Sequence, residues 1–252
     1  MFVNLVALLV ASACSGDGGE APRYTEDQTV VSGAESGVFD TPDGDECIEL
    51  ESGACISPQD ECGDDGTAQV IVDGSGDVLR IRCVDQESDI IYADEDGFPT
   101  EDGGFVVLDQ GLVVDHDVSL EGSDTVIVAD GEEGATIEGS VEVGGDNNLI
   151  SGVRITGDLN LTGAAATAVD CIVEGDVTIP GNGGILANCT VFGSIKITGN
   201  AARLTFNSVQ GGVDSSAMTL ECDGNEDFVD ENEDLVVQEE ELGGALECGG
   251  ER

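Results

Sequence analysis

Aliphatic residues return at every sixth position along the middle of the chain. Ile, Leu or Val fills eleven of thirteen such positions, which are Ile137, Val143, Leu149, Ile155, Leu161, Thr167, Val173, Ile179, Ile185, Val191, Ile197, Arg203 and Val209. A second aliphatic set lies two residues before these, as at Val141, Leu159 and Val177. This alternation with a period of two is typical of strands with one buried face, and it excludes helices.

Two columns of glycine set the length of the repeat. Both columns have an 18-residue spacing, one at Gly139, Gly157, Gly175, Gly193 and Gly211 and the other at Gly145, Gly163, Gly181 and Gly199. Because only glycine adopts positive φ freely, we expect a corner with positive φ at each of these positions. Stacked laps bury the apolar face that one lap cannot bury alone. The sequence therefore predicts an all-β fold, a short parallel β-helix (β-solenoid) with 18-residue coils.

Two stretches resemble the laps of known solenoid families. The segment Val173-Glu-Gly-Asp-Val-Thr-Ile179 resembles the laps of bactofilins, which are right-handed β-helices. The segment Asp146-Asn-Asn-Leu-Ile-Ser-Gly-Val-Arg-Ile155 is similar to the Asn-rich laps of pectin-lyase-like solenoids. The resemblance covers residues 121–215 and is one of fold. It favours a right-handed helix over the left-handed hexapeptide type, whose glycine or acidic residue directly follows the aliphatic position.

The first fourteen residues indicate export. An uncharged, largely apolar run of twelve residues from Phe2 to Ala13 is too short to span a bilayer and ends at Ala11-Ser-Ala-Cys14. This resembles a bacterial lipoprotein signal, which implies removal of residues 1–13 and a lipid on Cys14. We therefore expect a lipid-anchored protein of the cell envelope, on the outer membrane or cell surface. An ordinary secretory signal with a free or paired Cys14, and a cytosolic protein, are the alternatives.

The cysteine count agrees with export. Without Cys14, an even number of eight cysteines remains as disulfide candidates, namely Cys47, Cys55, Cys62, Cys83, Cys171, Cys189, Cys222 and Cys248. Cys171 and Cys189 lie one lap apart in a predicted inward column, where they either form a bridge or stack as small hydrophobic residues. Cys222 and Cys248 are predicted to staple the C-terminal segment. The four N-terminal cysteines allow three pairings.

Acidic residues dominate the chain, with a formal net charge of −47. The charge is concentrated outside the solenoid: residues 14–136 carry 33 acids and 3 bases, 137–220 carry 8 and 3, and 221–252 carry 13 and 1. Nucleic acid is excluded as a partner, because phosphate binding requires a basic surface. A membrane would hold the protein through the lipid alone.

Composition also divides the chain into five segments. Residues 1–13 are the signal peptide, 14–46 a flexible acidic tether, 47–99 a small cysteine-rich β unit stapled by disulfides, 100–220 the parallel β-helix and 221–252 an acidic C-terminal cap. Within the third segment, Ala68–Val72 and Val78–Cys83 flank Asp73-Gly-Ser-Gly-Asp77 and predict a hairpin.

Oxygen-rich segments raise the question of a metal. Asp223, Asn225, Asp227 and Asp234 match an EF-hand-like loop at positions 1, 3, 5 and 12, but Phe228 stands where the sharp turn needs glycine. We expect no cofactor, with calcium at these four residues as the weaker alternative. No C-x-x-C pair accompanies the cysteines, so we do not expect zinc.

Catalytic chemistry has little support. Glu174, Asp176 and Lys196 form the only dense outward group of acids and bases, and the single histidine, His116, lies between two aspartates. We interpret the chain as a non-catalytic cell-envelope lipoprotein, a structural or binding and adhesion module and not an enzyme. A polysaccharide-binding or polysaccharide-acting pectin-lyase-like protein and a self-associating bactofilin-like unit are the alternatives.

An apolar column is predicted on the outside of the solenoid. Ile150, Ala168, Leu186 and Leu204 follow one another at intervals of one lap and have the parity of outward positions. Such a stripe suits docking of a glycan or another envelope protein. The alternative is that the flanking segments cover it.

Overall fold

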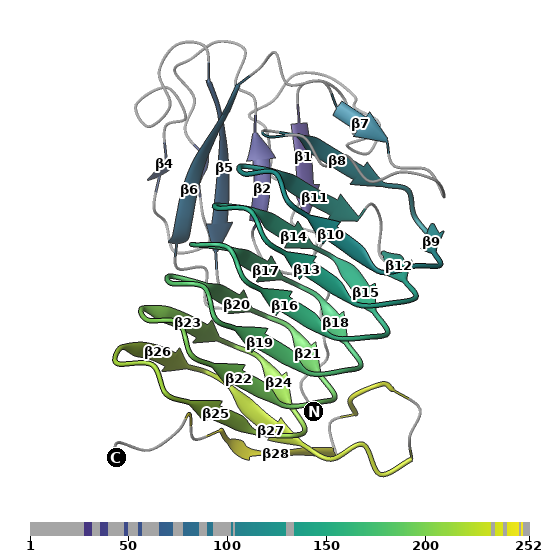
Figure 1. Cartoon of the computed structure of the whole chain (residues 1–252), viewed down its shortest axis with the longest axis vertical. Helices are drawn as coiled ribbons and strands as arrows, with labels where there is room; N and C mark the ends of the chain where they lie inside the picture. Colours follow the sequence, from purple (N-terminus) through teal and green to yellow (C-terminus); the bar gives the residue numbers. More distant parts are fainter. Residues whose placement is uncertain are drawn as a thin grey trace. The chain divides into compact units, whose positions relative to one another are not determined.

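The computed structural model shows a β-solenoid and a separate N-terminal β unit (Figure 1). It describes residues 102, 104–129, 134–232, 235–238, 241–246 and 248, and the backbone of the strands between residues 28 and 92. At positions 105 and 107 the description is likewise limited to the backbone. The chain divides into two compact units, residues 1–86 and 87–252, which are treated separately below.

Three sheets form the walls of the solenoid. Sheet 1 consists of β10 (Val118–Leu120), β13 (Val141–Val143), β16 (Leu159–Leu161), β19 (Val177–Ile179), β22 (Ile195–Ile197) and β25 (Val213–Ser215). Sheet 2 consists of β7 (Ile90–Tyr92), β8 (Phe105–Leu108), β11 (Val126–Ala129), β14 (Leu149–Ser151), β17 (Thr167–Val169), β20 (Ile185–Ala187), β23 (Ala202–Thr205) and β26 (Leu220–Asp223). Sheet 3 consists of β9 (Val113–Val114), β12 (Ala135–Ile137), β15 (Val153–Ile155), β18 (Ile172–Val173), β21 (Thr190–Val191), β24 (Ser208–Val209), β27 (Glu226–Phe228) and β28 (Leu242–Ala245).

The strand register confirms the 18-residue coil. Neighbouring strands pair in parallel, and Val141 faces Leu159 of the next lap in sheet 1. The lap before Val141 is longer, because its partner on the other side is Val118. Among the strands described in the solenoid, only β28 runs antiparallel, beside β27. The all-β parallel solenoid predicted from the sequence is therefore present, while its right-handedness stays a prediction.

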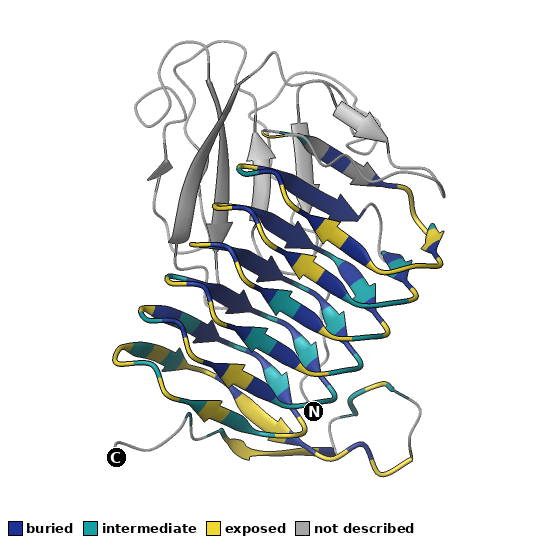
Figure 2. Cartoon of the chain, in the orientation of Figure 1, coloured by how far each residue is buried: buried dark blue, intermediate teal, exposed yellow. Residues whose placement is uncertain are grey.

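The core has the predicted columns in sheets 1 and 3 but the opposite parity in sheet 2. Ile150, Ala168, Leu186 and Leu204 are fully buried in the core cluster, so the prediction of an outward apolar stripe was wrong. The columns that fill the other two walls, for example Ile155 and Leu161, are buried as expected. Figure 2 shows the middle strands of sheet 2, from β11 to β20, as buried along their length.

Positive-φ residues at the corners on both sides of sheet 2 explain the reversed parity. The corner before sheet 2 has one in each lap, at Asn147 (60°), Ala165 (57°), Gly183 (70°) and Ala201 (56°). One corner residue per lap separates sheet 2 from sheet 3, and it has positive φ in each case: Gly152 (70°), Asp170 (54°), Asn188 (53°), Phe206 (54°) and Gly224 (63°). A residue in the left-handed region turns the chain without completing the two-residue alternation. Side chains on sheet 2 are thus shifted by one position relative to a uniform six-residue period.

The repeating glycines have a different role from the one predicted. Neither glycine column has φ in the left-handed region, so the prediction of positive φ at these corners was wrong. They are instead places where laps touch through their backbones. A Cβ on Gly157 would lie 2.7 Å from the carbonyl oxygen of Gly139, and a Cβ on Gly163 would overlap the carbonyl of Gly145. Close approach, and not a special dihedral, requires glycine there.

The N-terminal unit is antiparallel. Its four-stranded sheet has the order β1 (Gln28–Val31), β2 (Ser36–Phe39), β5 (Gly66–Val72) and β6 (Val78–Asp85), and β3 (Ile48–Glu49) pairs with β4 (Cys55–Ile56). The β5–β6 pairing confirms the predicted hairpin. Strands β1 and β2 fall within residues 14–46, the segment predicted as a tether. Strand β1 pairs with β2, and β2 pairs with β5.

Candidate functional site at the C-terminal end of the solenoid

Polar side chains outside the solenoid link one lap to the next. The Asp158 carboxylate accepts the backbone N–H of Asp176 at 2.9 Å, and the Asp176 carboxylate accepts the backbone N–H of Ser194 at 2.7 Å and its hydroxyl at 2.9 Å. A second column does the same where Asn182 Oδ1 accepts the N–H of Asn200 at 2.9 Å. These side chains hold adjacent turns together.

The bonds from Ser194 affect the acidity of Asp176. The backbone N–H of Ser194, and then its hydroxyl, stabilise the charged carboxylate and lower the pKa of Asp176 below the usual aspartate value.

A third, buried column changes from thiols to amides along the solenoid. Cys171 and Cys189 are free buried thiols one lap apart, and the N–H of Cys171 lies 3.4 Å from Cys189 Sγ. Of the two arrangements the sequence allowed, the structure has stacked cysteines. Side chains in adjacent parallel strands point the same way, at a separation near the lower limit for a disulfide. Burial raises the pKa of Cys189 well above its usual range.

Asparagines continue the same column toward the C-terminus. The Asn207 amide oxygen accepts the N–H of Cys189 at 2.9 Å, and its amide nitrogen donates to the carbonyl of Leu186 at 2.9 Å. Asn225 repeats this one lap later, accepting the N–H of Asn207 at 2.9 Å and donating to the carbonyl of Leu204 at 2.8 Å. Corner backbone groups that would be buried without partners are thereby satisfied.

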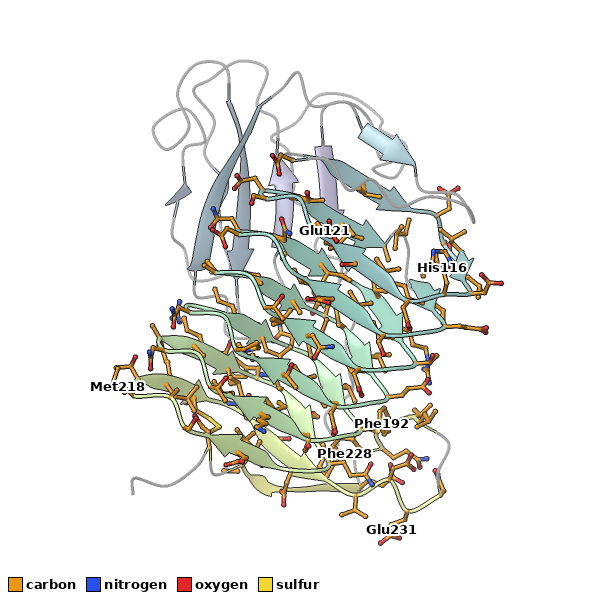
Figure 3. All side chains as sticks on the ribbon, viewed as in Figure 1. His116, Glu121, Phe192, Met218, Phe228 and Glu231 are labelled. Atoms are coloured by element: carbon orange, nitrogen blue, oxygen red, sulfur yellow. A yellow bond between two sulfur atoms is a disulfide. The ribbon has the colours of Figure 1, made fainter. Side chains whose placement is uncertain are left out.

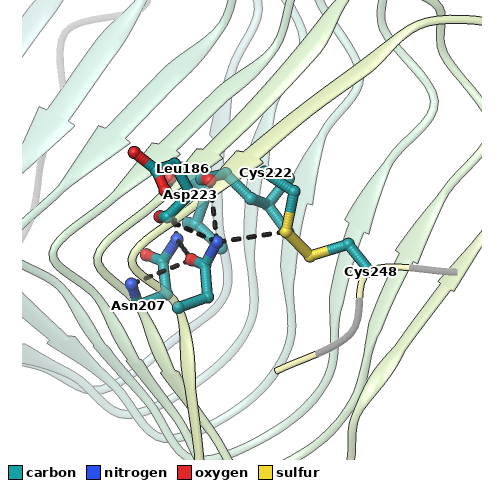
Figure 4. The surroundings of a disulfide bond; sticks show 7 residues. Leu186, Asn207, Cys222, Asp223 and Cys248 are labelled. Atoms are coloured by element: carbon teal, nitrogen blue, oxygen red, sulfur yellow. Dashed lines mark hydrogen bonds between the residues drawn. A yellow bond between two sulfur atoms is a disulfide. The ribbon is translucent and has the colours of Figure 1, made fainter. Parts of the chain in front are cut away.

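In the last lap, two columns that hold aliphatic side chains in earlier laps end in a disulfide-bonded cysteine and a hydrogen-bonded aspartate. Cys222 continues the Leu204 column and forms the predicted disulfide with Cys248, with Cα atoms 6.3 Å apart (Figure 4). Asp227 continues the Val209 column, and its carboxylate accepts the N–H of Gly244 in β28. A groove of about 270 Å³ lies between the turn at residues 222–226 and the end of β28 at residues 245–246.

This arrangement explains the EF-hand-like pattern. Asn225 is 4% exposed and its amide is used within the Asn column, while Asp227 bonds to β28. The structure therefore does not bring Asp223, Asn225 and Asp227 together as ligands, and Asp234 lies outside the described residues. Asp223 ends β26, Asn225 lies in the turn after it and Asp227 lies in β27, so the spacing of two residues follows the chain around a corner of the final lap. Among the described residues, no three His, Cys, Asp or Glu side chains converge as a metal site.

A loop between β27 and β28 extends from the closing lap (Figure 3). The Val229 N–H donates to the Glu241 carbonyl at 3.0 Å and closes the loop at its base. Phe228, just before it, is buried and meets Phe192 edge-to-face with ring centroids 5.2 Å apart. The Glu241 carboxylate accepts the N–H of Glu231 at 3.1 Å. The exposed surface here is acidic and carries a few apolar side chains.

The remaining sequence candidates are spread over the solenoid. Glu174 pairs with Arg154, whose guanidinium nitrogens lie 2.7 and 2.8 Å from its carboxylate oxygen. Lys196 is exposed on β22. His116 is about half exposed, with Nδ1 3.5 Å from Asp115. Glu174 is thus engaged with a residue that the predicted dense group did not include.

Several N-terminal candidates lie outside the described residues. Cys14, Cys47 and Cys62 are among them, and only the strand backbone is described at Cys55 and Cys83. Their lipidation and pairing remain predictions.

Sequence reasoning missed Asn207, Glu241 and Asp230 as bonding residues. A signal for the first was present, because Asn207 and Asn225 lie one lap apart in an inward column. Glu241 and Asp230 lie in a run of acids that gives no indication of which carboxylates are buried.

Fold and closing lap together define a short β-solenoid protein whose C-terminal end is sealed by a disulfide and an antiparallel strand. A comparison of the chain with family models, curated proteins and solved structures found no significant match. Across the part of the chain that the structure describes, no helix has the length and apolar character needed to cross a membrane.

Proposed function

We propose that the chain is a non-catalytic module of the cell envelope, held on a lipid at Cys14 and acting as a structural or binding element. The observation that carries this is the use of the outward polar columns, in which Asp158, Asp176 and Asn182 bond the next lap. Side chains committed to lap-to-lap bonds stabilise a rigid support and are not free to move protons for substrate chemistry.

The two alternatives receive less support. A polysaccharide-acting protein of the pectin-lyase-like kind needs outward acids and bases available to a glycan, but Glu174 is paired with Arg154 and Asp176 bonds Ser194. A bactofilin-like unit that stacks end to end needs open terminal laps, whereas β28 and the Cys222–Cys248 disulfide cover the C-terminal one.

Fractionation of cells tests the proposed lipid anchor and cellular location. The wild-type protein should sediment with membranes and carry an acylated N-terminal cysteine in mass spectra, and Cys14→Ala should appear in the soluble fraction. Cys171→Ala is the matched control, because it removes a buried thiol and should leave the protein with the membranes. A Cys14→Ala protein that stays membrane-bound without acylation would refute the lipid anchor.

A further inference from the structure

The loop of residues 229–241 buries two carboxylates. Asp230 is 8% exposed and Glu241 is 9% exposed, values found for no other acidic side chain among the described residues. Both Glu241 oxygens have partners, since they accept the N–H of Glu231 at 3.1 Å and of Gln238 at 3.0 Å. Glu241 therefore sits in the neck of the loop and ties its two arms together.

Only one of the two carboxylate oxygens of Asp230 has a hydrogen-bond partner among the described residues. Its Oδ2 accepts the N–H of Leu235 at 3.1 Å, which turns the carboxylate toward the inside of the loop. Its Oδ1 is buried and has no hydrogen-bond partner among the described residues. A carboxylate oxygen that is removed from water without a hydrogen-bond partner carries its full desolvation cost, and a cation bound to that oxygen would offset the cost.

The sequence of this segment adds negative charge and no positive charge. Residues 229–241 contain seven acids and no Lys, Arg or His. Asp230 and Glu241 are near each other, because Glu241 bonds the backbone of Glu231, the residue next to Asp230. Two buried carboxylates with no base on the same loop repel each other, and a positive ion between the arms would remove that repulsion.

We propose a calcium-binding site at Asp230, in which its Oδ1 is a direct ligand. Calcium takes oxygen ligands from carboxylates, backbone carbonyls and water, and it tolerates irregular geometry, so a loop with few side-chain ligands can hold it. The carboxylate of Glu241 supplies further negative charge and fixes the neck. The site does not use Asp223, Asn225 or Asp227, and it goes beyond the proposed structural or binding role.

Calorimetry and hydrogen exchange on the full chain test the site. Titration of calcium-free protein with CaCl2 should show one site with a Kd of about 10⁻⁴ M, the range of extracellular calcium modules. Calcium should then slow hydrogen exchange in peptides from residues 229–241, and NaCl of equal ionic strength should not. Absence of saturable binding, or protection confined to another region, would overturn the proposal.

Two matched variants separate a ligand from general charge. Asp230→Asn keeps an acceptor for the Leu235 N–H but removes the charge, and it should weaken calcium binding at least tenfold. Glu231→Gln removes the same charge from an exposed neighbour and should change the Kd by less than about threefold, since exposed charges are screened. Equal effects of the two substitutions would mean that calcium is attracted only by the net charge of the loop, and this result would refute a specific site. If Asp230→Asn does not fold, the exchange pattern of the wild type decides.

Discussion

Gly175 leaves no room for a methyl group, so Gly175→Ala should destabilise the solenoid. A Cβ there would lie 2.6 Å from the carbonyl oxygen of Gly157 in the preceding lap and would also meet the Asp158 carboxylate. An ordinary contact begins at 3.4 Å, so the two laps would have to separate by 3.4 − 2.6 = 0.8 Å. Gly157 and Gly175 are stacked at the corner between sheets 3 and 1 and are joined by a backbone hydrogen bond, so the two laps cannot separate by that distance without loss.

One backbone bond would lengthen with that separation. The N–H of Gly175 donates to the carbonyl of Gly157 at 3.1 Å, so this bond is already long. Overpacking costs about 1–3 kcal/mol, and the weakened bond about 0.5–1.5 kcal/mol. The expected loss is therefore about 1.5–4.5 kcal/mol, which lowers Tm by roughly 5–15 °C in a domain of this size.

Gly183→Ala is the matched control. Gly183 has φ of 70°, but a Cβ there would touch nothing closer than 3.9 Å, and its column neighbours Ala165 and Ala201 already have φ of 57° and 56°. We expect a change within about 1 kcal/mol. Thermal and urea unfolding followed by circular dichroism measure both variants. Equal losses at Gly175 and Gly183 would refute close approach as the reason for the glycine column.

Two further substitutions probe the polar columns. Asn207→Ala should cost about 2–5 kcal/mol in urea unfolding, because it leaves the buried N–H of Cys189 and carbonyl of Leu186 without partners; an unchanged midpoint would contradict the buried amide column. Since Ser194 lowers the pKa of Asp176 below the usual aspartate value, the charged carboxylate contributes stability above the unfolded-state pKa and loses it as pH falls through the folded-state pKa. The stability advantage of wild type over Asp176→Asn should shrink as pH falls below about 5, and a carboxyl pKa by NMR at or above the usual aspartate value would contradict it.

Strand positions in two of the three sheets could be predicted because their side chains obey a strict period. Val173 and Val177 lie inward in sheets 3 and 1 as their spacing indicates. Sheet 2 could not be placed this way. Its parity depends on positive-φ residues at its corners, and the corner after sheet 2 holds Gly152, Asp170, Asn188, Phe206 and Gly224. Four of these five are Gly, Asp or Asn, the residue types that adopt the left-handed region most readily, so the sequence carried a signal that the glycine columns concealed. Phe206 has the same dihedral without that preference.

The closing lap escaped prediction for a related reason. Cys222, Asn225 and Asp227 occupy inward columns, but they are polar or covalently linked, so they interrupt the aliphatic period that marks a lap. In the sequence, the spacing of Asn225 and Asp227 matched positions of an EF-hand-like loop. The Cys222–Cys248 pairing was predicted because two cysteines bracket the acidic segment, a pattern that does not depend on the lap register.

All the columns repeat every 18 residues, so the solenoid can be shortened or lengthened by whole laps. Removing residues 158–175 would join Gly157 directly to Asp176, and the glycine, aliphatic and hydrogen-bonding columns would each meet a residue of the same kind. Duplication of one such segment would lengthen the rod by one strand spacing, about 4.8 Å. In-frame gain or loss of 18 codons therefore changes the length of the solenoid by one lap at a time. Such a change leaves the C-terminal end, with its disulfide and antiparallel strand, unaltered.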